Sequence, residues 1–211
     1  MTLFWWLIVA TLVVAAVDWW AVATDRRPVE YVLKPAAMVV LIAAALALND
    51  PVADLARWFL VIGLVCSLAG DVFLMLDEKW FIAGLVSFLF GHVAYVVALL
   101  QFPLTPWAGG LAAVLVVVAA VLIGTRIVRG AGQRDARLQL PVVAYLTVIS
   151  LMVVSAGATT VLFAIVGATL FYASDGLLGW NRFVGPLPAG RLGVMTTYHL
   201  GQVGLVLALL G

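Results

Sequence analysis

Apolar residues fill most of this chain in runs long enough to cross a lipid bilayer, and short polar stretches separate the runs. A membrane-spanning helix needs roughly 20 predominantly apolar residues. The pattern therefore predicts an all-α membrane protein with eight transmembrane helices. Their predicted ranges are about 3–24, 31–48, 56–76, 80–101, 107–127, 138–157, 159–179 and 190–210.

The stretches between the predicted helices carry most of the charges, prolines and glycines. The longest predicted loops run from Arg126 to Arg137 and from Asn181 to Gly190. The least marked boundary lies between the sixth and seventh helices, where the uncharged stretch from Ser155 to Thr160 is the only interruption. Glycine, proline and charged clusters of this kind punctuate helices, so we expect the chain to turn at each of them.

Composition supports a single transmembrane domain over residues 1–211. Hydrophobic residues make up 66% and charged residues 10% of the chain, too little polar surface for a water-soluble domain of this length. The net charge of +1 does not indicate a nucleic-acid partner. Cys66 is the single cysteine, which excludes an internal disulfide. The first apolar run lacks a basic stretch before it, so we expect a retained helix rather than a cleaved signal.

Basic residues predict the orientation of the chain in the membrane. Nine of the eleven lysines and arginines fall in odd-numbered loops, whereas Arg57 alone falls in an even-numbered loop. Cytoplasmic loops carry an excess of lysine and arginine. We therefore expect the odd loops in the cytoplasm and both termini outside. The alanine- and arginine-rich composition is typical of a GC-rich bacterium, so we expect the chain to be integral to a bacterial cytoplasmic membrane. The nine residues are Arg26, Arg27, Lys79, Arg126, Arg129, Arg134, Arg137, Arg182 and Arg191.

Two aspartates inside apolar runs are the strongest candidates for chemistry. Asp71 and Asp175 each lie near the predicted cytoplasmic end of an inward-running helix. An aspartate at membrane depth costs about 2.5–3.5 kcal/mol, so it should be paired, protonated or exposed to a wet cavity. Two acids at matched depth suggest a site in which one is neutral and the other ionised. The alternative is that each is a structural group bonded to a neighbouring helix.

Lys34 lies near the same end, followed by Pro35. It either reaches the cytoplasmic headgroups as a snorkelling side chain or points inward to pair with an aspartate or a lipid phosphate. Asp18 is flanked by Trp19 and Trp20, which is typical of an interfacial aromatic belt. We therefore interpret Asp18 as an interfacial residue.

Further polar side chains lie deeper, towards mid-membrane. His92 and Tyr95 share a face of the fourth helix, and Tyr198, His199 and Gln202 are clustered on the eighth. We take His92 as a candidate catalytic residue and Lys34, Tyr95, Tyr198, His199 and Gln202 as candidate substrate-binding residues, with interhelical hydrogen bonding as the alternative. The outer half is nearly all apolar, which indicates a polar pocket open to the cytoplasmic side and closed by an apolar plug.

Metal and cofactor motifs do not emerge from the sequence. The two histidines and two aspartates lack the spacing of a zinc site, so we expect no metal. The chain also lacks a phosphate-binding loop, a nucleophile elbow and a dinucleotide fingerprint, so we expect no cofactor.

The two halves of the chain share a faint repeat. Lys34-Pro35 precedes Asp71, and Leu140-Pro141 precedes Asp175 at a similar distance. Each aspartate is followed by a helix that carries a histidine. Since four helices would separate the halves, the repeats would be parallel and related by an axis along the membrane normal.

The order of these residues resembles the YhhN family of membrane proteins. The matching positions extend over nearly the whole chain: Lys34-Pro35, Gly70-Asp71, Leu74-Met75, Gly84-Leu85, Phe88, Gly91-His92, Tyr95, Tyr145, Met152, Gly167, Phe171, Ser174-Asp175, Arg182-Phe183, Tyr198 and Gln202. Characterised members of that family are lysoplasmalogenases. The resemblance implies hydrolysis of the vinyl ether bond of a lysoplasmalogen, which releases a fatty aldehyde and a glycerophospho-choline or -ethanolamine.

The candidate residues suit that chemistry. A vinyl ether is hydrolysed by protonation at carbon, and the resulting oxocarbenium ion is captured by water. Asp71 and Asp175 would divide the roles of proton donor and stabilising carboxylate, as paired acids do in glycoside hydrolysis. Lys34 would bind the phosphate and the apolar plug would take the alkenyl chain. The alternative function is a transporter or proton-coupled carrier, which should show a polar path to both faces.

The predicted orientation is tested with reporter fusions. A fusion at the C-terminus should report the outer face, and a fusion between Arg126 and Arg137 should report the cytoplasm, because the basic residues concentrate in odd-numbered loops. Activity of a periplasmic reporter such as alkaline phosphatase at each site gives the measurement. The opposite pattern would place the polar pocket in the other leaflet.

Overall fold

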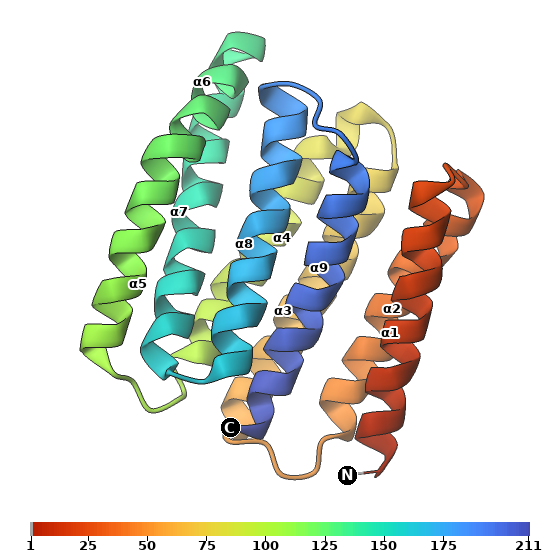
Figure 1. Ribbon diagram of the computed structural model, residues 1–211, viewed down its shortest axis with the longest axis vertical. Helices are drawn as coiled ribbons and strands as arrows, with labels where there is room; N and C mark the ends of the chain where they lie inside the picture. The colour runs from red at the N-terminus through yellow and green to blue at the C-terminus, as the bar shows by residue number, and fades with distance from the viewer. Residues whose placement is uncertain (1) are drawn as a thin grey trace.

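The computed structural model describes residues 2–211 as a bundle of roughly antiparallel helices (Figure 1). Within that range it contains helices and no strand, and eight helical segments are long and apolar enough to cross a membrane. The prediction of an eight-helix membrane protein is therefore confirmed. The α-helices are α1 (Thr2–Ala23), α2 (Arg27–Ala47), α3 (Asp54–Met75), α4 (Phe81–Leu99), α5 (Pro106–Ala119), α6 (Thr125–Arg134), α7 (Ala136–Thr159), α8 (Leu162–Phe183) and α9 (Gly190–Leu207).

Three short segments complete the helical structure. A 3₁₀ turn, η1 (Glu78–Trp80), leads into α4, and another, η3 (Ala208–Leu210), ends the chain. A π-helical segment, η2 (Ala120–Gly124), joins α5 to α6, so that one spanning helix runs from Pro106 to Arg134.

The helices are arranged around α9. Helix α9 packs against α8 along its length and also contacts α1, α2 and α3. Figure 1 shows α1 and α2 at one side of α9, α5 and α7 at the other, and α3 and α4 behind. Both termini lie at the same end of the bundle, opposite the turns that connect α1 to α2 and α8 to α9. The orientation of this bundle in the membrane and the internal repeat stay predictions.

The outer surface of the bundle is apolar. Leu140 is 77% exposed and Trp107 is 74% exposed, and both belong to predicted spans. Large apolar side chains cover much of α1, α5 and η2 in the same way. Such a surface is stable when lipid tails surround it, since the backbone groups of each helix are already satisfied internally.

Two predicted boundaries were wrong because helices continue past the apolar runs. The stretch predicted as a loop from Arg126 to Arg137 is helical as far as Arg134, since Ile127 and Ala131 of α6 are buried against α7 and Phe183. Asp135 then turns the chain and caps α7 by accepting a hydrogen bond of 2.9 Å from the Arg137 backbone N–H.

The loop predicted from Asn181 to Gly190 also begins later, because α8 continues to Phe183. Arg182 reaches across to Glu78, with a nitrogen–oxygen distance of 2.7 Å, and stacks on the ring of Phe81. The weakly marked break between the sixth and seventh spans is confirmed at Thr160, whose backbone is left-handed with φ of 57°.

Glycines allow α8 and α9 to approach within backbone contact. A Cβ atom built on Gly167 of α8 would lie 2.6 Å from the Leu205 backbone nitrogen, and one on Gly204 of α9 would lie 2.7 Å from the Gly167 Cα. Small residues at helix interfaces permit such packing in membranes. Larger side chains at these two positions would push α9 away from α8, and so disturb the site described below.

Replacement of Gly167 by alanine should therefore destabilise the bundle. Overpacking of a tight interface costs about 1–3 kcal/mol, and here the clash is with backbone that cannot rotate away. The measurement is thermal unfolding of the purified protein in detergent. Gly110→Ala is the matched control, because a Cβ there meets no atom within 4 Å; equal stability of the two variants would contradict the close contact.

Candidate active site

The fold brings Asp71 of α3 and Asp175 of α8 to one cavity. This polar cavity has a volume of about 310 Å³ and is bounded by α2, α3, α4, α8 and α9. Asp71 is 1% exposed, and the side chain of Asp175 is 9% exposed. Both acids therefore line a space of the size that binds small ligands.

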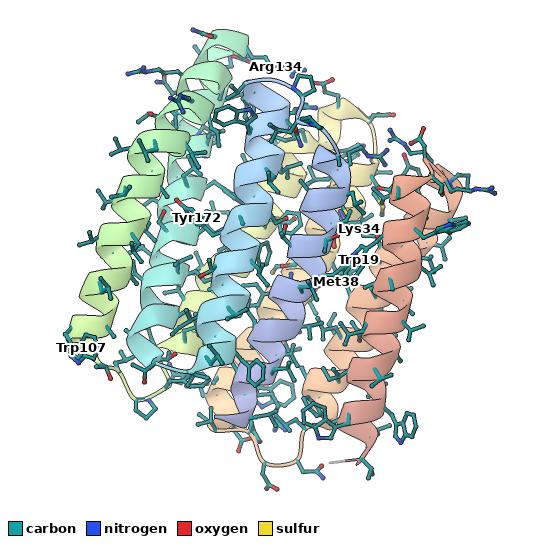
Figure 2. All side chains as sticks on the ribbon, viewed as in Figure 1. Trp19, Lys34, Met38, Trp107, Arg134 and Tyr172 are labelled. Carbon is teal, nitrogen blue, oxygen red and sulfur yellow. The ribbon has the colours of Figure 1, made fainter. Side chains whose placement is uncertain are left out.

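Asp71 is held by a lysine and a tyrosine. The Lys34 Nζ atom lies 2.8 Å from Asp71 Oδ1, and the Tyr198 hydroxyl donates a hydrogen bond of 2.6 Å to Asp71 Oδ2. Lys34 is itself buried, with 5% of its surface exposed, and Figure 2 shows it inside the bundle beside α9. It is therefore not a snorkelling side chain. A buried carboxylate needs such a cation, because an unpaired charge is strongly disfavoured there.

Asp175 has different neighbours. The Tyr145 hydroxyl of α7 donates a hydrogen bond of 2.5 Å to Asp175 Oδ2, and His92 Nε2 of α4 lies 3.6 Å from the same oxygen. Among the described residues, no lysine or arginine forms an ion pair with Asp175. The two acids thus share a cavity but differ in charge environment.

The orientation of His92 follows from its other ring nitrogen. Nδ1 lies 2.7 Å from the backbone carbonyl oxygen of Phe88, one helical turn earlier. A carbonyl oxygen only accepts, so Nδ1 carries the hydrogen and a neutral ring leaves its lone pair on Nε2. That lone pair faces Asp175, which makes His92 a base or a hydrogen-bond acceptor next to the carboxyl group.

Aromatic rings close the site on the side of the bundle core. Phe171 is fully buried, and its ring centroid lies 4.7 Å from that of His92 and 5.3 Å from that of Tyr198. The Phe88 ring lines the polar cavity and packs edge-on against Tyr198 at 6.0 Å. Phe88 and Phe171 pack edge-on against Tyr198, and Phe171 lies tilted against His92, so the tyrosine and histidine rings are packed in place beside the acids.

Three of the predicted substrate-binding residues lie outside the cavity lining. Tyr95 donates a hydrogen bond of 2.6 Å to Gln202 Oε1 and contacts Ser67 Oγ at 3.3 Å, which ties α4 to α9 and α3. His199 accepts a hydrogen bond of 3.0 Å at Nδ1 from the Trp19 indole. These contacts match the alternative interpretation of Tyr95, His199 and Gln202 as groups that connect helices.

Two polar residues near the site were not predicted as part of it. Tyr145 was recognised as a matching position but not as the partner of Asp175. The interfacial interpretation of Asp18 was wrong: Asp18 is fully buried, because Trp19 bonds His199 and this turns that part of α1 towards the bundle. A tyrosine or aspartate on one helix carries no signal for its partner on another, so sequence spacing could not reveal either contact.

Charged residues surround the mouth of the cavity. Arg191 Nη2 lies 2.6 Å from Glu30 Oε2, and its Nη1 lies 2.9 Å from Asp25 Oδ1. Asp25 also pairs with Arg27 at 3.2 Å. The hydrogen bonds from Arg191 and Arg27 hold the pKa of Asp25 below its usual value. Arg27, Glu30 and Arg191 line the cavity, so its entrance presents both signs of charge.

Comparison with known proteins gives matches over most of the chain. The model of the YhhN family matches residues 29–209. Lysoplasmalogenase TMEM86B of Mus musculus is 34% identical over 157 residues, which cover 72% of this chain and 64% of that protein. Lysoplasmalogenase of Mycobacterium tuberculosis (strain CDC 1551 / Oshkosh) is 34% identical over 155 residues, or 71% of this chain and 58% of that protein. The matched part thus spans about three fifths of these relatives, and no solved structure matches the chain.

The buried ion pair makes a clear prediction about stability. Lys34→Met should destabilise the protein by about 3–5 kcal/mol, because it leaves the Asp71 carboxylate buried without its cation. The double variant Lys34→Met/Asp71→Asn should recover most of that loss. Thermal unfolding in detergent measures both, with Lys79→Met at an exposed position as the control. A double variant as unstable as the sum of the single variants would show that the two groups do not interact.

Proposed function

The chain belongs to the YhhN family, and from this membership and the geometry of the buried acids we propose that it is a lysoplasmalogenase-like hydrolase. Its substrate would be an alkenyl-glycerophosphocholine or -ethanolamine, and its products a fatty aldehyde and the glycerophospho-base. The observation that carries the proposal is that Asp71 and Asp175 line one cavity in different charge environments.

The contacts of each acid suggest its role. Lys34 and Tyr198 both stabilise a negative charge on Asp71, which suits a carboxylate that faces a developing cation. Asp175 lacks such a cation but receives the Tyr145 hydroxyl at Oδ2. Its other oxygen is then the place for a proton. We therefore assign the proton donor to Asp175 and the stabilising carboxylate to Asp71.

In the first step Asp175 protonates carbon. Its O–H bond breaks, and the π electrons of the vinyl group form the new C–H bond at the carbon remote from the ether oxygen. The oxygen-bearing carbon becomes part of an oxocarbenium ion, and the Asp71 carboxylate stabilises that positive charge. This division of labour is the one that paired carboxyl groups perform at glycosidic bonds.

In the second step water completes the hydrolysis. The oxygen of water bonds to the cationic carbon, and its proton returns to the Asp175 carboxylate, so that a hemiacetal forms. The bond from that carbon to the glycerol oxygen then breaks. The glycerol oxygen takes the electron pair and the proton from Asp175, while the hemiacetal hydroxyl loses its own proton to Asp175 and becomes the aldehyde carbonyl. One water is consumed and the enzyme is restored.

Lys34 then acts through Asp71 rather than by binding the phosphate directly. Its ammonium is buried and pairs with Asp71 at 2.8 Å, whereas the side chains of Arg27 and Arg191, which pair with acids at the entrance of the same cavity, are 56% and 43% exposed. We propose that these guanidinium groups face the headgroup. We propose that the His92 ring, whose Nε2 lies 3.6 Å from Asp175 Oδ2, limits the movement of that carboxyl group by packing beside it. The substrate would enter from the cytoplasmic side, where the basic loops are predicted.

The rival function, a transporter, fits the core less well. Towards the end of the bundle that carries the termini, the packing consists of apolar side chains such as Phe4, Leu48, Leu60 and Leu209. A carrier needs a polar path through both halves of the membrane. A hydrolase needs access from one side, which is what the polar cavity offers.

The roles of the two acids are tested by substitution. Asp71→Asn and Asp175→Asn should each lower aldehyde release from a lysoplasmalogen by more than about a hundredfold, because general acid–base groups contribute about 10²–10⁴. Purified protein in detergent and a coupled aldehyde assay give the measurement. Asp50→Asn, at an exposed loop position, is the control and should leave the rate unchanged. Near-normal turnover in either cavity variant would refute the paired-acid mechanism.

A further inference from the structure

An apolar groove lies on the opposite side of α8 from Lys34. Its volume is about 480 Å³, and it is bounded by α5, η2, α6, α7 and α8. Ile123, Ile149, Tyr172 and Leu177 are among its lining residues, and Figure 2 shows Tyr172 on the side of α8 that faces α7. Its rim includes Ile123, which is 43% exposed on the outer surface of the bundle. The groove therefore opens sideways, towards lipid.

The π-helical segment helps to form this groove. Five residues, Ala120–Gly124, interrupt the α-helical register between α5 and α6. Gly124, at the end of that segment, is buried and lines the groove without a side chain. At the other helix, a Cβ on Gly176 would meet no atom within 4 Å. Space is thus left on both walls, and π segments of this kind are frequent at functional sites.

The groove meets the polar cavity at Asp175. That residue lines the groove and also lines the polar cavity, although the two spaces lie on different faces of α8. Arg126 and Trp180 also line the groove, and the Arg126 guanidinium lies 5.9 Å from the Trp180 ring centre. Ala119 and Ile149 line it at the level of the middle of their spans.

We propose that this groove holds the hydrocarbon chain of the lipid substrate, an inference that rests on the proposed function. In an alkenyl lysolipid the vinyl ether is the junction between a polar headgroup and an apolar chain. Asp175 lies at the junction between a polar cavity and an apolar groove. If the headgroup occupies the cavity and the hydrocarbon chain occupies the groove, the vinyl ether between them would lie next to Asp175. The hydrocarbon chain of the lipid then lies in the groove beside α8, and not in the apolar plug expected from the sequence.

Two variants that fill the groove test the chain site. Gly176→Phe places a ring in the open space next to α8, and Ala119→Trp fills the groove from the α5 wall, away from Asp175. Gly110→Phe is the matched control, since that glycine is equally free of neighbours but does not line the groove. Each protein is assayed with a sixteen-carbon alkenyl lysophosphatidylcholine and with a four-carbon analogue.

The expected result is a change in chain-length preference. The ratio of kcat/KM for the long substrate to that for the short one should fall at least tenfold in Gly176→Phe and Ala119→Trp, and should be unchanged in Gly110→Phe. An unchanged ratio in both groove variants, whether their rates are normal or equally reduced, would overturn the proposal.

A binding measurement separates this inference from the proposed chemistry. A lysophosphatidylcholine with an ester linkage and a diazirine near the end of its chain carries no vinyl ether, so its binding does not depend on hydrolysis. After irradiation, mass spectrometry should find label at Ile123, Tyr172 or Leu177, and unlabelled lysolipid should suppress it. Suppressible labelling without vinyl ether hydrolysis would support the groove and refute the proposed function. Labelling of the groove that unlabelled lysolipid does not suppress would overturn the chain site alone.

Discussion

The contact between Lys34 and Asp71 is the constraint on which the site depends. Two opposite charges at membrane depth are tolerated when each neutralises the other and hydrogen bonds satisfy the remaining atoms. Their distance of 2.8 Å fixes α2 against α3, and the Tyr198 hydroxyl adds α9 to the same contact. The backbone contact at Gly167 and Gly204 then sets how near α8, with Asp175, lies to that group. The glycine contacts between α8 and α9 and the ion pair between Lys34 and Asp71 therefore act together to place the two aspartates beside one cavity.

The sequence predicted the fold well because a membrane imposes a simple rule. Each span must be apolar and helical, so the spans appear as separate runs and their ends follow from charges. The prediction failed where tertiary contacts outweigh that rule. Helix α6 continues to Arg134 although its sequence is polar, because Ile127 and Ala131 are buried beneath α7 and Phe183. Such burial depends on a neighbouring helix that the local pattern does not contain.

The site was predictable in part for a related reason. Asp71, Asp175 and Lys34 are conspicuous since charged residues are expensive in a span, and their depth follows from the topology. Which side chains meet across helices does not follow, because helix rotation decides it. Tyr145 and Asp18 were therefore missed, and Tyr95 and Gln202 were grouped with the substrate although they bond to each other at 2.6 Å. The groove could not be predicted, since it arises from the π turn and from glycines on two helices.

The difference between the two acids follows from the helices that flank them. Asp71 lies where α2 and α9 supply a lysine and a tyrosine, so its charge is satisfied within the protein. Asp175 lies at the border of the apolar groove, where α7 and α4 supply one hydroxyl and one imidazole nitrogen. A group that must give up a proton to a carbon atom has to sit next to the apolar part of its substrate, whereas a permanent carboxylate has to sit next to a cation. Asp175 beside the groove and Asp71 beside Lys34 satisfy both requirements within one cavity, and the reaction we propose, on a vinyl ether between a polar headgroup and an apolar chain, would use this difference between the two acids.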